Sequence, residues 1–222
     1  MGETTEFRLN IGCGIEWREG YLNVDVCHLP ELIQQSRAFY PDNPEKWLPT
    51  SGIEVICWDL RESWPWPDAS VSEIMADNLL EHFDHEELAQ VMREVFRVLI
   101  PGGVMWGRVP DFAEVWRRCA EDLDYAFYPM LGAGPYSHPA ENALHNFCYT
   151  WGHKQVFTWR MLVHWFQMTG LWLEDPVREA GQVWMMFRAW KPGGSVNDDA
   201  TETGTATGPS NADLPAAEAS VP

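Results

Sequence analysis

Basic residues are scarce in this chain. It has 15 Lys and Arg against 33 Asp and Glu, so the formal net charge is −18. Five of the acids and none of the bases fall in residues 192–222, which leaves residues 1–191 with a formal charge of −13. A surface with this charge repels a phosphate backbone, and the sequence contains no cluster of Lys and Arg that would offset it. We therefore expect no nucleic-acid partner.

Long apolar runs and paired cysteines are also missing. Nowhere do 18 apolar residues follow one another, and the amino-terminal stretch "MGETTEFRLN" lacks the apolar core of a secretory signal. The five cysteines are scattered and form no Cys-x-x-Cys motif. These absences lead us to expect a cytoplasmic protein with reduced thiols and no membrane contact.

Aromatic residues, Lys and Arg are absent from residues 192–222. This segment consists mainly of small, polar and acidic residues, which cannot bury enough apolar surface to offset the entropy of ordering. We predict a disordered acidic tail over 192–222 and one domain over 1–191. The whole chain is 45% hydrophobic and 13% aromatic, which is enough for one sizeable core.

Strand and helix patterns alternate along the predicted domain. Alternating or β-branched apolar runs predict strands at 7–11, 21–26, 53–60, 71–77, 103–110, 171–181 and 182–190. Helical periodicity predicts helices at 31–40, 85–100, 112–123 and 159–170, and residues 124–157 are expected to be rich in loops. This order predicts an α/β fold: a seven-stranded, mostly parallel sheet with helices on both faces and a carboxyl-terminal antiparallel hairpin strand.

Helix boundaries carry recognisable capping residues. Asp84 followed by Glu87 predicts a capping box, and Asp111 and Thr158 can cap the next two helices. The run Pro101-Gly102-Gly103 is expected to end the helix that Asp84 begins.

Polar residues and glycines stand at four successive predicted strand ends, where open α/β sheets bind ligands. Gly12 and Gly14 would let the backbone approach a ligand closely, Asp25 could accept hydrogen bonds from two ribose hydroxyls, and Asp59 could accept one from an adenine amino group. Each signal alone also fits an ordinary turn, cap or solvated loop. Their joint order, with Asn78 after the fourth strand, favours a cofactor that contains a nucleoside.

The stretches "LNIGCG", "GYLNVD", "VICWDL", "MADNLLEHF" and "RVLIPGG" make the chain recognisable. Over residues 7–111 it resembles the class I S-adenosylmethionine-dependent methyltransferases, and it is most similar to small bacterial and phage members with a methyltransferase type 11-like domain. The resemblance implies a Rossmann-like fold, S-adenosylmethionine as cofactor, and in-line transfer of its methyl group. The implied cofactor-binding residues are Asn10, Gly12, Cys13, Gly14, Asp25, Val26, Asp59, Leu60, Asn78 and His82.

Three departures from the family pattern concern the first of these stretches. Asn10 stands where the family often has an acid, and Glu16 stands where a third glycine is common. Only ten residues separate Gly14 from Asp25, which leaves no room for a full helix between the first two strands. We therefore expect a short first crossover and a more open methionine end of the cofactor site.

The methyl acceptor would bind elsewhere, and residues 111–157 are interpreted as an acceptor-binding insertion. The stretch "HNFCYTWGH" at 145–153 is dense in aromatic residues and histidine, and we expect it to form the acceptor pocket or its lid. Candidate catalytic bases are His145, His153 and Asp111, with His138 and the tyrosines of this segment (Tyr125, Tyr128, Tyr136 and Tyr149) as further donors or pocket walls. No metal site is expected, because His82 and His85 have no third ligand at a zinc-like spacing.

These observations predict a methyltransferase that acts on a small molecule or a sugar-containing precursor. A methyltransferase-like binding or scaffold module without catalysis stays open, because of Asn10 and the short crossover. A nicotinamide-dependent oxidoreductase is disfavoured, since the glycine motif lacks a further glycine and the Glu81-His82 pair would have no role there.

Overall fold

The computed structural model describes residues 6–49, 52–125, 134–149, 152–175, 177 and 182–193. Every element below belongs to Met1–Pro192, the first of two units into which the chain divides. Nearly all of the predicted tail at 192–222 lies outside the described residues, as does Tyr128. The tail therefore stays a prediction.

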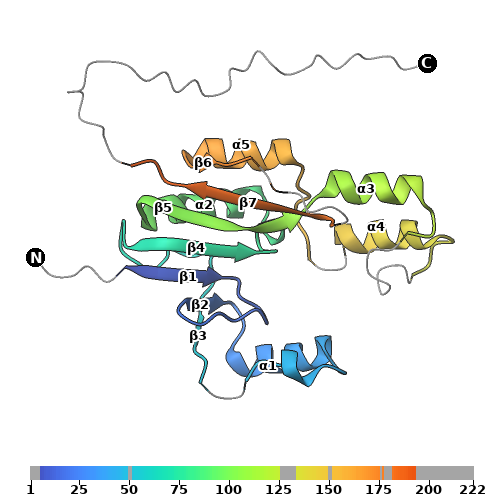
Figure 1. Cartoon of the computed structure of the whole chain (residues 1–222), viewed down its shortest axis with the longest axis horizontal. Coiled ribbons are helices and arrows are strands. Elements are labelled where there is room, and N and C mark those ends of the chain that lie inside the picture. Colours follow the sequence, from blue (N-terminus) through green and yellow to red (C-terminus); the bar gives the residue numbers. More distant parts are fainter. Residues whose placement is uncertain are drawn as a thin grey trace, which may run out of the picture. The chain divides into compact units, whose positions relative to one another are not determined.

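Seven strands form one sheet in the order β3-β2-β1-β4-β5-β7-β6 (Figure 1). Strands β1 to β5 run parallel, and β7 pairs antiparallel with both β5 and β6. The predicted Rossmann-like sheet with a closing antiparallel hairpin is thus confirmed. The strands are β1 Phe7–Ile11, β2 Leu22–Asp25, β3 Val55–Cys57, β4 Val71–Asp77, β5 Leu99–Pro110, β6 Trp172–Leu173 and β7 Trp184–Trp190.

The helices begin where the capping residues predict. The Asp84 carboxylate accepts hydrogen bonds from the Glu86 and Glu87 amides, and the Glu87 carboxylate accepts one from the Asp84 amide, which is the predicted capping box. The Asp111 carboxylate accepts from the Glu114 amide and the Thr158 hydroxyl accepts from the Met161 amide, so these two residues cap the next two predicted helices. The helices are α1 Leu29–Phe39, α2 His85–Val98, α3 Phe112–Glu121, α4 Pro139–Tyr149 and α5 Trp159–Thr169, with short 3-10 turns η1 at Pro44–Lys46 and η2 at Leu80–His82.

Helices α2 and α5 share the main core with the inner strands. Leu88 and Val95 of α2 and Phe166 of α5 are fully buried together with strand residues such as Ile74 and Met105. A second cluster joins α1 to the loop after β1 through Leu32 and Cys13. A third joins α3 to α4, which lie side by side beyond the carboxyl ends of β5 and β4 (Figure 1).

Several boundaries differ from the prediction, among them that of the strand predicted over 171–181, of which β6 covers Trp172–Leu173. Residues 139–149 form helix α4 instead of loop, because Ala140, Ala143 and Phe147 recur at helical spacing and bury themselves against α3. Strand β5 begins at Leu99, directly after α2, so the Pro-Gly-Gly run lies inside the strand and does not precede it. Strand β3 covers only Val55–Cys57, since the chain turns at Asp59.

The connection from β1 to β2 is a short loop without a helix, as its length predicts. Its place is held by polar contacts of Asn10, whose amide nitrogen donates to the Glu16 carbonyl and to the Asn23 side chain, both at 2.9 Å. Among the described residues, no helix is both long and apolar enough to cross a membrane.

Candidate cofactor site at the strand ends

A cavity of about 450 Å³ opens where β1, β2, β3 and β4 end. Parallel strands bring their carboxyl ends to one edge, so residues far apart in sequence meet there. Eight of the ten predicted cofactor residues line this cavity: Gly12, Gly14, Asp25, Val26, Asp59, Leu60, Asn78 and His82. Its volume lies in the range typical of small-molecule sites.

The glycine turn after β1 shapes one wall. Gly12 and Gly14 have φ of 60° and 48°, a region that favours glycine. The Asp25 carboxylate accepts hydrogen bonds from the Gly14 amide at 2.8 Å and the Cys27 amide at 2.9 Å. A carboxylate has about four acceptor positions, so Asp25 keeps capacity for a ligand. The wall is therefore rigid backbone with one fixed acceptor.

The remaining two predicted residues, Asn10 and Cys13, lie beneath this wall. Asn10 is 1% exposed and is engaged with the crossover loop. Cys13 is buried in the cluster around α1, and burial raises the pKa of its thiol to about 12. Neither is among the residues that line the cavity. Their contact with the cofactor stays a prediction.

Two polar atoms of the cavity wall have no partner within the described part of the chain. These are the side-chain oxygen of Asn78 and the indole nitrogen of Trp58. Buried polar groups are nearly always hydrogen-bonded, so an unpaired acceptor and an unpaired donor in two residues that line one cavity favour a polar ligand beside them. Asn78 also has a φ of 50°, which is uncommon for a residue with a side chain. A nucleoside with polar substituents fits these groups.

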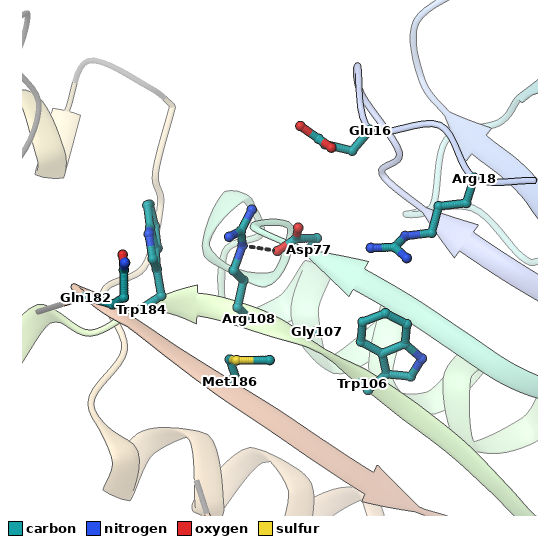
Figure 2. Close-up of a pocket in the computed structure, with 9 residues that line it drawn as sticks. All are labelled: Glu16, Arg18, Asp77, Trp106, Gly107, Arg108, Gln182, Trp184 and Met186. Carbon is teal, nitrogen blue, oxygen red and sulfur yellow. Dashed lines mark hydrogen bonds and ion pairs between the residues drawn. The ribbon is translucent and has the colours of Figure 1, made fainter. Parts of the chain in front are cut away.

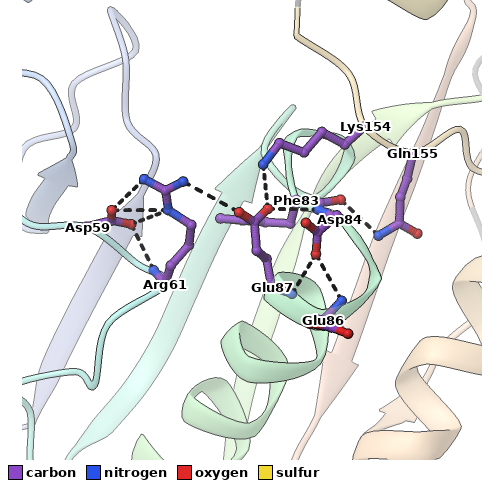
Figure 3. Close-up of polar contacts among 8 residues, drawn as sticks. All are labelled: Asp59, Arg61, Phe83, Asp84, Glu86, Glu87, Lys154 and Gln155. Atoms are coloured by element: carbon purple, nitrogen blue, oxygen red, sulfur yellow. Dashed lines mark hydrogen bonds and ion pairs between the residues drawn. The ribbon is translucent and has the colours of Figure 1, made fainter.

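Ion pairs among lining residues from the segment after β3, from α2 and from the segment before α5 form a second wall (Figure 3). Arg61 binds Asp59 at 2.6 Å and reaches Glu87 at 3.5 Å, and Lys154 binds Glu87 at 2.6 Å. The Arg61 guanidinium lowers the pKa of Asp59, and the Lys154 ammonium lowers that of Glu87. Asp59, the predicted adenine acceptor, is thus charged and already shared with Arg61.

Glu81, His82 and His153 meet behind the cavity. Glu81 is 1% exposed, and burial raises the pKa of its carboxyl to about 8. The His82 ring lies against the His153 ring, with the two centroids 5.1 Å apart. Burial also lowers the pKa of both imidazoles, that of His153 to about 4. Of these three residues, His82 lines the cavity.

The three predicted catalytic bases lie in different surroundings. Asp111 is buried and caps α3 through the Glu114 amide. His145 is exposed on α4, with its ring against those of Tyr136 and Tyr149. Because α4 extends to Tyr149, the stretch 145–153 that was expected to form a loop is partly helical. His153 contacts His82 and thereby adjoins the cavity.

A second cavity of about 360 Å³ lies on the other side of the end of β4 (Figure 2). Asp77 lines it, whereas Asn78, the next residue, lines the first cavity. Arg108 binds Asp77 at 2.5 Å, and the Arg18 guanidinium lies 5.2 Å from the Trp106 ring. Its lining residues are Glu16, Arg18, Asp77, Trp106, Gly107, Arg108, Gln182, Trp184 and Met186.

Sequence reasoning missed several residues of both cavities. In the first cavity these include Gln35, Trp58, Arg61, Leu79, Phe83, Glu87 and Lys154. Trp58 and Arg61 lie within two residues of Asp59 in the chain, so their closeness to a predicted site residue could have identified them. Lys154 is 67 residues from its partner Glu87, and no local pattern connects the two.

Solved structures share this fold across nearly the whole chain. The PH0226 protein from Pyrococcus horikoshii is 18% identical, with a TM-score of 0.51 over 82% of this chain and 80% of that one. A SAM-dependent methyltransferase from Methanosarcina mazei is also 18% identical, with a TM-score of 0.51 over 86% and 95%. A chain from the complex of the Haloferax volcanii Trm112 methyltransferase activator is 12% identical, with a TM-score of 0.55 over 85% and 83%. At such low identities, these structural matches establish the fold alone.

A family model links the fold to an activity. Residues 9–107 match the model of a methyltransferase domain, and this range holds the glycine turn, Asp25, Asp59 and Asn78. Comparison with curated proteins finds no match. The matched domain, the sheet order and the cavity at the strand ends agree with one another: residues 9–107, somewhat less than half of the chain, carry a methyltransferase domain on the class I fold, with S-adenosylmethionine as its cofactor.

Proposed function

We propose that this methyltransferase acts on a small molecule or a sugar-containing precursor by in-line methyl transfer, with the cofactor in the cavity at the ends of β1 to β4. The observation that carries the placement is the pair of open polar atoms, Asn78 Oδ1 and Trp58 Nε1, in a cavity that Gly14 and Asp25 also line. Bound S-adenosylmethionine supplies an electrophilic sulfonium methyl group.

Each wall of the cavity would hold a different part of the cofactor. The open space at Gly14 suits the methionine part, and the free acceptor positions of Asp25 suit the ribose hydroxyls. Asp59 and Leu60 would lie against the adenine, with Trp58 Nε1 as a further donor. Val26, 60% exposed at the rim, would cover an edge of the nucleoside.

The protein's contribution to the reaction is positioning. Methyl transfer requires the acceptor atom to lie in line with the methyl group, and fixing that geometry supplies much of the rate enhancement. A proton acceptor is needed only when the substrate atom arrives protonated. Among the predicted bases, the contact of His153 with His82 favours His153 as the residue nearest the reacting groups.

The second cavity supports a small acceptor with a ring. Trp106 and Trp184 offer indole faces on which a flat ring or a sugar can pack, and Arg18 and Arg108 offer donors beside them. The end of β4 is common to both cavities, since Asp77 lines one and Asn78 the other. The formal charge of −13 over residues 1–191 disfavours a nucleic-acid acceptor.

Calorimetry followed by an acceptor screen tests the proposal. We expect S-adenosylmethionine and S-adenosylhomocysteine to bind with one-to-one stoichiometry, and Trp184→Ala to leave that binding unchanged. A screen of small hydroxylated and sugar-bearing acceptors, read out as homocysteine release in a coupled assay, should then give turnover that Trp184→Ala reduces. Folded protein that binds neither cofactor form would leave only the scaffold function.

A further inference from the structure

Glu81, His82 and His153 form a three-residue cluster, and the proposed reaction gives Glu81 no role. One ligand atom from each side chain lies within 4.8 Å of the others. Among the described residues, this is the cluster of His, Cys, Asp and Glu side chains that is close enough to hold a metal ion. We propose that these three residues bind a divalent transition-metal ion of the zinc type beside the cofactor cavity.

Glu81 is the observation that points to a ligand. Its side chain is 1% exposed, and neither carboxylate oxygen has a hydrogen-bond partner in the described structure. A buried carboxyl group without partners is rare, because burial of an uncompensated polar or charged group is costly. A bound dication would compensate both oxygens and the charge at once.

The backbone holds the cluster together across a long sequence separation. The Glu81 carbonyl accepts hydrogen bonds from the Lys154 amide at 2.8 Å and the Gln155 amide at 3.1 Å, so His153 is fixed next to η2. The Gln155 side chain adds a bond of 2.9 Å to the Phe83 carbonyl. The Phe147 ring packs on His153 at 5.4 Å from the other side. The three ligands are therefore brought together by two segments that are themselves anchored.

The ligand types and spacing suit the zinc class. Two imidazoles and one carboxylate are a common set for Zn²⁺ and Fe²⁺, and imidazole binds as the neutral base. Bond lengths of about 2.0–2.1 Å place tetrahedral ligand atoms about 3.3 Å apart. The three ligand atoms lie within 4.8 Å of one another, so each side chain would have to move by about 1 Å or less to bind one ion.

The position of the cluster gives such an ion a specific neighbourhood. His82 lines the cofactor cavity, so a metal held by His82 would lie at its wall. Three protein ligands leave a fourth position open, as in catalytic zinc sites. His85 does not take part, because its ring packs on Trp165 with the centroids 5.3 Å apart. The third ligand is His153, which is 71 positions beyond His82 and has no spacing signature.

Metal titration of the full-length protein tests this inference. After removal of metal with a chelator, we expect one equivalent of Zn²⁺ to bind in competition with a chromophoric chelator. Glu81→Gln and His153→Ala should each weaken binding by about 100-fold or more, because even loss of a group that only orients a ligand costs 10–100-fold. His85→Ala should bind as the wild type does.

A cysteine elsewhere in the chain could also bind Zn²⁺, and a separate variant controls for this. Cys57 is exposed, with its sulfur 3.8 Å from a His28 ring nitrogen. Cys57→Ser should leave the affinity unchanged, and Co²⁺ bound to the wild type should show ligand-field bands without a thiolate charge-transfer band. Absence of stoichiometric binding, equal affinity in Glu81→Gln, or a thiolate band would overturn the inference.

Two checks separate this inference from other failures. Circular dichroism identifies a variant that does not fold. If Glu81→Gln does not fold, the zinc affinity of His153→Ala and the Co²⁺ spectrum of the wild type decide whether the site exists. The inference does not depend on cofactor binding: protein that takes up Zn²⁺ but not S-adenosylhomocysteine would contradict the proposed cofactor site alone.

Discussion

The two walls of the cofactor cavity are built from different physical parts. The wall after β1 and β2 consists of backbone, with Gly12 and Gly14 at positive φ and Asp25 held by two amides. The wall after β3 consists of partly exposed ion pairs among Asp59, Arg61, Glu87 and Lys154. Replacing a buried group that is hydrogen-bonded to the backbone costs much free energy, whereas exposed ion pairs contribute little to stability. We therefore expect the first wall to set cofactor affinity and the second to adjust it.

The largest effect is expected from Gly12→Ala. A Cβ there would lie 2.4 Å from Cδ1 of Leu79, and the φ of 60° adds strain of about 1–2 kcal/mol for a residue with a side chain. Leu79 also lines the cavity, so its displacement would narrow the site. We expect a lower thermal midpoint together with loss of measurable cofactor binding by calorimetry.

Gly14→Ala is the matched control for that change. Its φ is 48°, but an added Cβ would meet no protein atom within 4 Å. Stability should therefore fall only by the strain, about 1–2 kcal/mol, while cofactor affinity falls because the methyl group enters the open space. If Gly14→Ala bound S-adenosylhomocysteine as tightly as the wild type, the ligand would not lie against this turn.

Asp25 offers the next largest effect. Asp25→Ala removes the acceptor of the Gly14 and Cys27 amides as well as the expected ribose contacts. Loss of hydrogen bonds to a charged group costs about 1.5–3 kcal/mol, or roughly 10-fold to 150-fold in cofactor affinity. Asp59→Ala serves as the comparison and should weaken binding less. Equal losses in the two variants, measured by calorimetry, would contradict the difference between the walls.

The first wall was also the more predictable from the sequence. Gly12, Gly14 and Asp25 stand at the ends of β1 and β2, and the strand pattern alone brings such positions to one edge. The capping residues Asp84, Asp111 and Thr158 predicted the starts of α2, α3 and α5 for the same reason, because their signals are local.

What the sequence did not predict depends on contacts between distant segments. Lys154 meets Glu87, and His153 meets His82, only because the Glu81 carbonyl binds the Lys154 and Gln155 amides. Helix α4 was missed because its small apolar face, Ala140 and Ala143, packs on α3 and not on the sheet. The Asn10 amide nitrogen donates to the Asn23 side chain, a contact between two strands that no local pattern predicts.

Glu87 connects the second wall to the fold, so its replacement should have a moderate effect. Glu87→Gln weakens both the capping box of α2 and the bond to Lys154, for which we expect a loss of about 1 kcal/mol at pH 7. Because Lys154 lowers the pKa of Glu87 below its ordinary 4.5, the carboxylate stabilises the fold above about pH 4.5. That contribution is lost as the pH falls through the lowered value, so denaturation curves of variant and wild type should converge in acid. A difference that persisted unchanged at pH 3 would contradict the charge-based account.

The smallest effect is expected from Arg61→Ala. Its side chain is 48% exposed, and exposed ion pairs contribute about 0–1 kcal/mol, so the unfolding midpoint should hardly move. Cofactor binding should respond more than stability does. In the wild type, Arg61 occupies the Asp59 oxygens that the adenine amino group would use. Its removal frees that carboxylate, and we expect affinity for S-adenosylhomocysteine to stay level or rise, with the gain largest at low salt, where the Arg61–Asp59 attraction is least screened. A fall of tenfold or more would mean that the guanidinium itself contacts the cofactor, and the second wall would then set affinity as the first does.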